Sequence, residues 1–172
     1  INISTYILVY VDDFIITGSN ESEIMNITQC LKEEFSIKDL GDLHYFLGIE
    51  VTKRNKSEMF LCQRRYIQDL LKRAKMDQAK SLPTPMVSSL RLSKDSGEAI
   101  TNETEYRSIV GALQYITITR PDISYSVNKV CQFMHNPLNN HWKAVKRILR
   151  YLRGTMNHGL HLNNKKGLNI QA

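Results

Sequence analysis

Tyr10-Val11-Asp12-Asp13 lies between two short apolar runs, at residues 6–9 and 14–16, and is the most informative stretch of the chain. β-Branched and aromatic residues dominate both runs, so the sequence predicts a β-hairpin with the two aspartates at its turn. Successive strand side chains point to opposite faces, and only a turn lets both carboxylates converge. Converging carboxylates repel each other, and a hard divalent cation such as Mg2+ relieves that repulsion. Aspartate is also a common turn former, so a solvated turn fits these residues equally well.

The composition is that of an ordinary globular protein with a basic excess. Of 172 residues, 42% are hydrophobic and 23% charged, which suffices for a core in one domain or in parts of two. The formal net charge of +6 favours an anionic partner, most often nucleic acid. Cys30, Cys62 and Cys131 lie far apart, which argues against a zinc site or a disulfide framework and predicts reduced thiols in an intracellular protein. No membrane span or signal peptide is evident.

The first half of the chain predicts a helix and then a ββα unit. A helix at residues 20–35 begins with Asn20 as its cap. A strand at 43–52, a return strand at 59–62 and a helix at 63–75 follow. The apolar positions of the first helix recur at helical spacing and predict one buried face: Ile24, Ile27, Leu31 and Phe35.

The second half predicts a linker and three helices. Residues 76–102 contain Pro-Thr-Pro and then many Ser, Asp, Gly and Asn residues, so we expect the main internal boundary there. Helices are predicted at 103–117 with Asn102 as cap, at 121–135 and at 140–153. The chain begins with isoleucine rather than methionine and both ends look cut, so we expect it to be a piece of a longer protein.

The Tyr-x-Asp-Asp hairpin resembles the catalytic hairpin of reverse transcriptases. The likeness continues at residues 35–51, 106–115 and 119–123, in the order found in the polymerase of Ty1/copia-type LTR retrotransposons, which are common in plant genomes. It covers roughly residues 6–162. Any one of these motifs would be weak, but several in the family's order are specific.

This resemblance implies an α+β fold: a truncated polymerase palm hairpin and a primer-grip β-hairpin with a thumb helix, followed by a helical connection segment. It implies that residues 1–80 are the C-terminal part of the palm plus the thumb. Residues 81–102 would be a linker and 103–155 the helical connection segment. Residues 156–172 would start a tether or RNase H-like strands.

The resemblance also implies a function. The parent polyprotein would carry out RNA-directed DNA synthesis on an RNA/DNA template–primer duplex with deoxynucleotides. Asp12 and Asp13 would be catalytic Mg2+ ligands, together with a third aspartate on an upstream strand that this sequence does not include. Tyr10 and Val11 would lie beside the terminal base pair. The primer grip would consist of Phe46, Leu47 and Gly48, whereas without the resemblance these residues would be interpreted as a plain strand in which Phe46 and Leu47 pack.

The last predicted helix carries a basic stripe opposite its apolar face. The stripe consists of Lys143, Lys146, Arg147, Arg150 and Arg153, with no acid among them. Such a stripe is suited to contacts with nucleic-acid phosphates, which add salt dependence to binding. A solvated helix face has a similar pattern, so both interpretations stay open.

Two other functional classes compete with the polymerase. The chain could be a catalytically inactive genomic remnant with at most weak nucleic-acid binding. A metal-dependent nuclease is disfavoured, because no further acid-rich motif supports Asp12 and Asp13. We expect the isolated chain to be inactive even if its parent is a polymerase.

Overall fold

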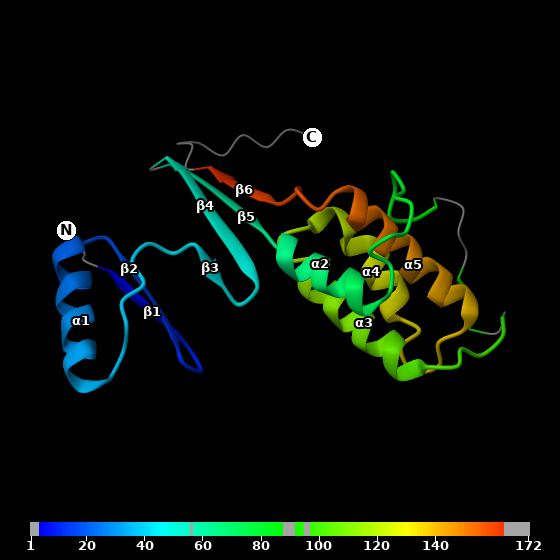
Figure 1. Ribbon diagram of the computed structural model, residues 1–172, viewed down its shortest axis with the longest axis horizontal. Coiled ribbons are helices and arrows are strands. Elements are labelled where there is room, and N and C mark those ends of the chain that lie inside the picture. The colour runs from blue at the N-terminus through cyan, green and yellow to red at the C-terminus, as the bar shows by residue number, and fades with distance from the viewer. Residues whose placement is uncertain (1–3, 56, 88–91, 95–96, 164–172) are drawn as a thin grey trace. The chain divides into compact units, whose positions relative to one another are not determined.

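The computed structural model describes residues 4–55, 57–87, 92–94 and 97–163 (Figure 1). Helices and antiparallel sheets are both present, which confirms the expected α+β class. The chain divides into two compact units, Ile1–Leu43 and His44–Ala172. The boundary that the sequence predicts within residues 76–102, with a linker at 81–102, stays a prediction. The palm, thumb and connection assignments stay predictions.

The first unit contains the predicted hairpin and helix. β1 (Thr5–Tyr10) pairs antiparallel with β2 (Asp13–Gly18), in a register that runs from Thr5↔Gly18 to Tyr10↔Asp13. α1 (Glu21–Glu34) follows. The Asn20 side chain accepts hydrogen bonds from two amides of its first turn, so the predicted cap is confirmed.

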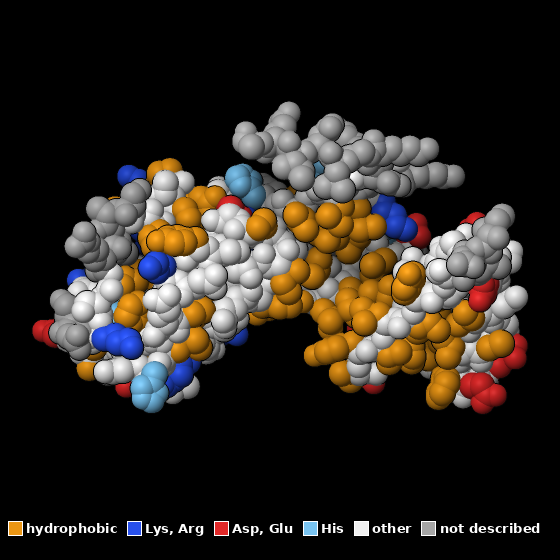
Figure 2. Space-filling view, turned by 180° about the vertical axis from the view of Figure 1, so that it is seen from behind, with side chains coloured by type: hydrophobic (Ala, Val, Ile, Leu, Met, Phe, Trp, Pro, Cys, Tyr) orange, Lys and Arg blue, Asp and Glu red, His pale blue; other side chains and the backbone are white. Residues whose placement is uncertain are grey.

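The predicted buried face of α1 is wrong. No residue of α1 is buried, and Phe35 just after it is 56% exposed. One helix and one two-stranded hairpin offer too little area to enclose a core. The hairpin is correspondingly exposed, and apolar side chains gather on the surface of this unit (Figure 2). The exposed apolar residues of the hairpin are Tyr6, Ile7, Leu8, Val9, Tyr10, Val11 and Phe14.

The second unit begins with an antiparallel sheet. Its order is β3 (Tyr45–Phe46), β4 (Ile49–Asn55), β5 (Glu58–Cys62) and β6 (Leu160–Asn163). The single strand predicted at 43–52 is therefore wrong, because a tight turn divides it into β3 and β4. β6 completes the sheet by pairing with β5, as at Leu61↔Leu160. The rest of the predicted terminal segment, 164–172, lies outside the described residues.

A helical bundle forms the core of the second unit. It consists of α2 (Arg64–Arg73), α3 (Glu103–Ile116), α4 (Ser124–Cys131) and α5 (Asn139–Gly154), which pack side by side in Figure 1. Among the predicted helices, the one at 121–135 differs most from the structure. The chain forms a 3-10 turn at Pro121–Ile123, and α4 then ends at Cys131, before the predicted end. Fully buried side chains from the helices include Ile67, Leu70, Tyr106, Leu113, Val145 and Leu149.

Within the described ranges, no helix is long and apolar enough to cross a membrane.

Arg120 is a buried cation that joins the connection between α3 and α4 to the end of α5. Its side chain is 1% exposed. Nε and Nη2 donate to the two carboxylate oxygens of Asp122 at 2.9 and 2.8 Å, and Nη1 donates to the Thr155 carbonyl at 2.8 Å. The Tyr151 hydroxyl also donates to Asp122, at 2.8 Å. A buried guanidinium is tolerated because its donors are paired with acceptors.

The pKa of Asp122 reflects two opposing influences. Burial raises it, but hydrogen bonds from Arg120 and Tyr151 and the Arg120 charge outweigh burial, so the pKa lies below its ordinary value. The carboxylate therefore stabilises the folded state above its unfolded pKa of about 3.9. This contribution is lost as the pH falls through the folded pKa.

Asp122→Asn should lower the free energy of unfolding by about 1–2 kcal/mol near neutral pH. Hydrogen bonds to charged groups contribute somewhat more, but Asp122 is partly exposed. The difference from the unmodified protein should shrink below about pH 4. Urea unfolding monitored by the fluorescence of Trp142, at neutral pH and below about pH 4, measures the loss of unfolding free energy and its dependence on pH.

Asp69→Asn is the matched control, because Asp69 is exposed and its ion pair with Lys72 spans 3.9 Å. A pH-independent effect of Asp122→Asn would show that the Arg120–Asp122 pair does not contribute as a charge pair.

Candidate functional site

The two aspartates lie at the tip of the β1–β2 hairpin. Tyr10 pairs with Asp13, so Val11 and Asp12 form a two-residue turn. Val11 has a φ of 52° and is 78% exposed, and both aspartates are exposed as well. A positive φ at the first turn position suits the twist of a hairpin, but it is rare and strained for a β-branched residue. Such strain is concentrated at functional sites.

The tip presents two exposed carboxylates, which are possible metal ligands. Carboxylate oxygens are the ligands that Mg2+ prefers. In the described part of the chain, however, no three His, Cys, Asp or Glu residues are grouped so that they could hold a metal ion. Asp12 and Asp13 have the right donor chemistry for Mg2+, but these two residues do not make a complete site.

The predicted primer-grip residues form a tight turn rather than a continuous strand. Phe46 pairs with Ile49, which leaves Leu47 and Gly48 as a two-residue loop with φ values of 48° and 83°. Two positive φ angles are typical of a type I′ hairpin turn. Glycine adopts this conformation freely, whereas leucine is strained in it. Because leucine is not a usual residue at such a turn, the sequence does not predict it.

Two tyrosines that we did not predict support this turn. The Tyr115 hydroxyl donates a hydrogen bond to the Leu47 carbonyl. The Tyr115 ring packs edge-to-face against Tyr66, with 5.2 Å between centroids. A Cβ on Gly48 would lie 3.4 Å from the Tyr66 ring and 3.7 Å from the Tyr115 ring. The turn therefore rests on α2 and α3. The only signal in the sequence was the place of Tyr115 at the end of the 106–115 stretch.

The strands beside the turn are also tied to α2. The Arg65 amide donates to the Glu50 carboxylate at 3.0 Å, and the Arg65 guanidinium lies 5.9 Å from the centre of the Tyr45 ring. These contacts attach β3 and β4 to the start of α2. Phe46, at the end of β3, and the Leu47–Gly48 loop thus lie on a supported hairpin within the second unit, whereas Asp12 and Asp13 belong to the first.

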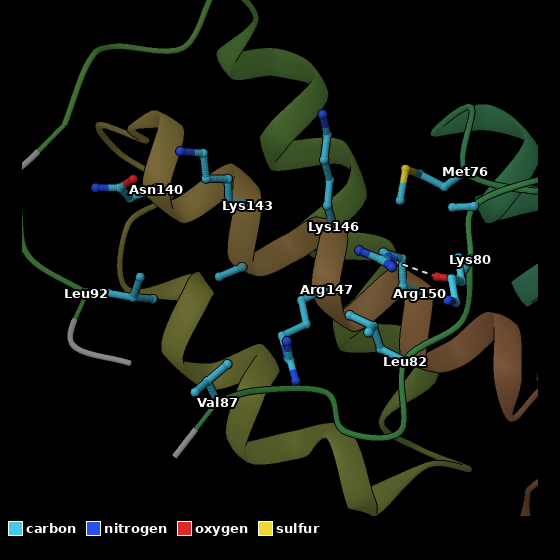
Figure 3. Close-up of a pocket in the computed structure, with 12 residues that line it drawn as sticks. Met76, Lys80, Leu82, Val87, Leu92, Asn140, Lys143, Lys146, Arg147 and Arg150 are labelled. Carbon is cyan, nitrogen blue, oxygen red and sulfur yellow. Dashed lines mark hydrogen bonds between the residues drawn. The ribbon is translucent and has the colours of Figure 1, made fainter. Parts of the chain in front are cut away.

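The basic stripe on α5 has a structural role that neither interpretation of the sequence included. Three of its arginines donate to a segment, residues 77–84, that follows α2. Arg147 Nη2 donates to the Thr84 hydroxyl at 2.7 Å. Arg150 Nε donates to the Lys80 carbonyl at 2.6 Å, as Figure 3 shows. Arg153 Nε donates to the Asp77 carbonyl at 2.7 Å. These bonds hold the start of the predicted linker within the second unit.

The two lysines of the stripe are differently placed. Lys143 and Lys146 are exposed, and in the described part of the chain neither forms an ion pair with an acid. Lys146 lies 5.5 Å from the centre of the Trp142 ring. The lysines are therefore the members of the stripe that do not hold residues 77–84, and their ammonium groups are open to an external anion.

Tyr115→Phe should loosen the 46–49 turn without unfolding the bundle. It removes the hydrogen bond to Leu47 and keeps the ring against Tyr66. The free energy of local opening at the Val51 amide, which donates to His44 across the β3–β4 hairpin, should fall by about 1 kcal/mol. Hydrogen exchange of that amide should then be about fivefold faster.

Tyr125→Phe is the control, since Tyr125 is exposed on α4 and its ring lies beside Lys129, far along the chain from the turn. Equal protection of Val51 in both variants would contradict the role of Tyr115.

Comparisons with known proteins agree with the resemblance to reverse transcriptases. Residues 3–88 match the family described as "Reverse transcriptase (RNA-dependent DNA polymerase)". The "Retrovirus-related Pol polyprotein from transposon RE1" of Arabidopsis thaliana is 53% identical over 97% of this chain. The corresponding polyprotein from transposon TNT 1-94 of Nicotiana tabacum is 40% identical over 87% of this chain. An uncharacterized mitochondrial protein of Arabidopsis thaliana is 45% identical over 97% of this chain and 69% of its own length.

No solved structure matches the chain. The chain spans 11% of the RE1 polyprotein and 12% of the TNT 1-94 polyprotein. The recognition made from the motifs is confirmed: this chain belongs to the reverse transcriptase family, in the Ty1/copia-type group of plant retrotransposon polyproteins.

Proposed function

We propose that Asp12 and Asp13 are catalytic carboxylates of an RNA-directed DNA polymerase that acts as part of a longer polyprotein. The observation that carries this proposal is the strained, exposed hairpin tip, which presents both aspartates within the residues that match the family. An exposed tip is open to a template–primer duplex and to an incoming deoxynucleotide. The relatives are named as Pol polyproteins, which supports the same activity for a longer protein containing this chain.

The aspartates would act as metal ligands. Mg2+, when bound, supplies positive charge to the phosphate oxygens that react in a two-metal nucleotidyl transfer. Asp12 would be the principal ligand at the turn, and Asp13 the supporting one at the start of β2. Because two carboxylates do not complete a site, a further carboxylate from elsewhere in the polyprotein has to join them. Tyr10 and Val11 would lie beside the terminal base pair.

The second unit would hold the nucleic acid. The 46–49 turn is suited to holding the primer terminus, because Tyr66 and Tyr115 attach it to two helices and so fix its position. α2 would belong to the thumb, and α3, α4 and α5 to the connection segment. Lys143 and Lys146 would contact phosphates directly. Arg147, Arg150 and Arg153 would contribute through the N–H groups that do not hold residues 77–84.

In a longer polyprotein that contains this chain, Asp12→Asn should lower the rate of single-turnover primer extension roughly 100- to 1,000-fold. The variant removes a charged metal ligand and keeps the side chain's size. Phe46→Ala should cause a clearly smaller loss, because it only misplaces the primer. Extension of a primed RNA template with Mg2+ and four deoxynucleotides measures both.

Glu34→Gln, on the exposed end of α1, is a control for charge removal in the same unit. Comparable losses for Asp12→Asn and Phe46→Ala would mean that Asp12 is an ordinary turn residue. Absence of extension in the unmodified polyprotein would favour the inactive remnant with weak nucleic-acid binding.

A further inference from the structure

A cavity of about 720 Å3 lies between α5 and the segment that follows α2 (Figure 3). Its size is that of pockets that bind small ligands. One wall is the α5 face that carries Lys143 and Arg147, and the other is formed by residues 76–87 and Leu92. The arginine bonds to Lys80 and Thr84 hold these two walls together, so the cavity is a built feature of the second unit.

The lining is cationic. Its charged members are Lys80, Lys143, Lys146, Arg147 and Arg150, and no Asp or Glu is among the lining residues. Over the described residues, none of these five cations forms an ion pair with an acid. Arg147 Nε is buried and has no hydrogen-bond acceptor there. Positive charge that no protein acid compensates attracts an anion, most strongly in a concave site.

Apolar residues on both walls of the same cavity make up a second part of its lining, which we call the apolar floor. It is formed by Met76, Ala79, Leu82, Val87, Leu92 and Ala144. A simple inorganic anion has no apolar surface to bury against such a floor. A ligand that carries both negative and weakly polar groups can contact the cations and the apolar residues at the same time. No aromatic side chain is among the described residues that line the cavity, so a bound ring would rest on aliphatic side chains.

We propose that this cavity binds a single nucleic-acid strand, with phosphates on Lys143 and Lys146 and with sugars and bases against the apolar floor. The interval from Lys143 to Arg150 spans about 10 Å along α5, which is long enough for more than one phosphate. A duplex keeps its bases stacked inside, out of reach of the floor, whereas a single strand can place them there. The proposal rests on the proposed function only for the identity of the anion as nucleic acid.

The test compares labelled single-stranded RNA and DNA with an RNA–DNA hybrid of equal length, by fluorescence anisotropy of the full chain at several salt concentrations. We expect tighter binding of the single strands. Lys143→Gln combined with Lys146→Gln should weaken single-strand binding roughly tenfold and reduce the salt slope by about 1.4, because each phosphate that the protein no longer neutralises lowers the slope by about 0.7.

A second variant examines the floor. Val87→Ser should weaken single-strand binding about fourfold and leave the salt slope unchanged, because it removes apolar surface and no charge. Val87 is exposed, so this change leaves the core intact. Lys129→Gln is the matched control for charge, since Lys129 lies on α4 and does not line the cavity. It should change neither the affinity nor the slope.

Hybrid binding as tight as single-strand binding would overturn the proposal, and so would an unchanged affinity for Val87→Ser. Equally tight binding of heparin, with no effect of Val87→Ser, would show an unspecific anion site and overturn it too. These results are independent of the primer-extension test, because that test depends on Asp12 and none of these variants touches the hairpin.

Discussion

The pairing of the buried Arg120 guanidinium is the interaction on which the second unit depends. Through Asp122 it fixes the start of the helical turn before α4, and through the Thr155 carbonyl it fixes the end of α5. The chain leaves α5 at that point and enters β6, which completes the sheet beside β5. One satisfied buried cation therefore links the turn before α4 to the end of α5, shortly before the chain enters β6.

The candidate site is positioned by contacts of the same long-range kind. The 46–49 turn rests on Tyr66 and Tyr115, which lie on two different helices of the bundle. The arginines of α5 hold residues 77–84 and so build the cavity, which leaves Lys143 and Lys146 for an external anion. The hairpin of the first unit is exposed, and its aspartates are positioned by strand register and by the strained turn at Val11.

The sequence by itself determined the features that depend on neighbouring residues. Three kinds of local signal, namely periodicity, turn formers and side-chain capping, predict the hairpin turn beside Asp12 and Asp13, the caps at Asn20 and Asn102, and the approximate bounds of α1, α2, α3 and α5. These signals depend on residues that are close together in the chain, so they can be recognised in the sequence without the fold. The motifs also determined the family, which the comparisons confirmed. The roles of individual site residues stay predictions.

The tertiary structure alone decided the features that join distant parts of the chain. Arg120 is buried because Thr155, 35 residues later, accepts its hydrogen bond. In the sequence Arg150 looks like a surface charge, but in the fold it donates a hydrogen bond to the carbonyl of Lys80, which is 70 residues away. The turn at Leu47 was hidden because leucine rarely adopts a positive φ, and only the tyrosines of α2 and α3 show how it is held. Side-chain type alone does not identify such partners, because the same arginine can meet water, an acid or a carbonyl, and the fold determines which of them lies within reach.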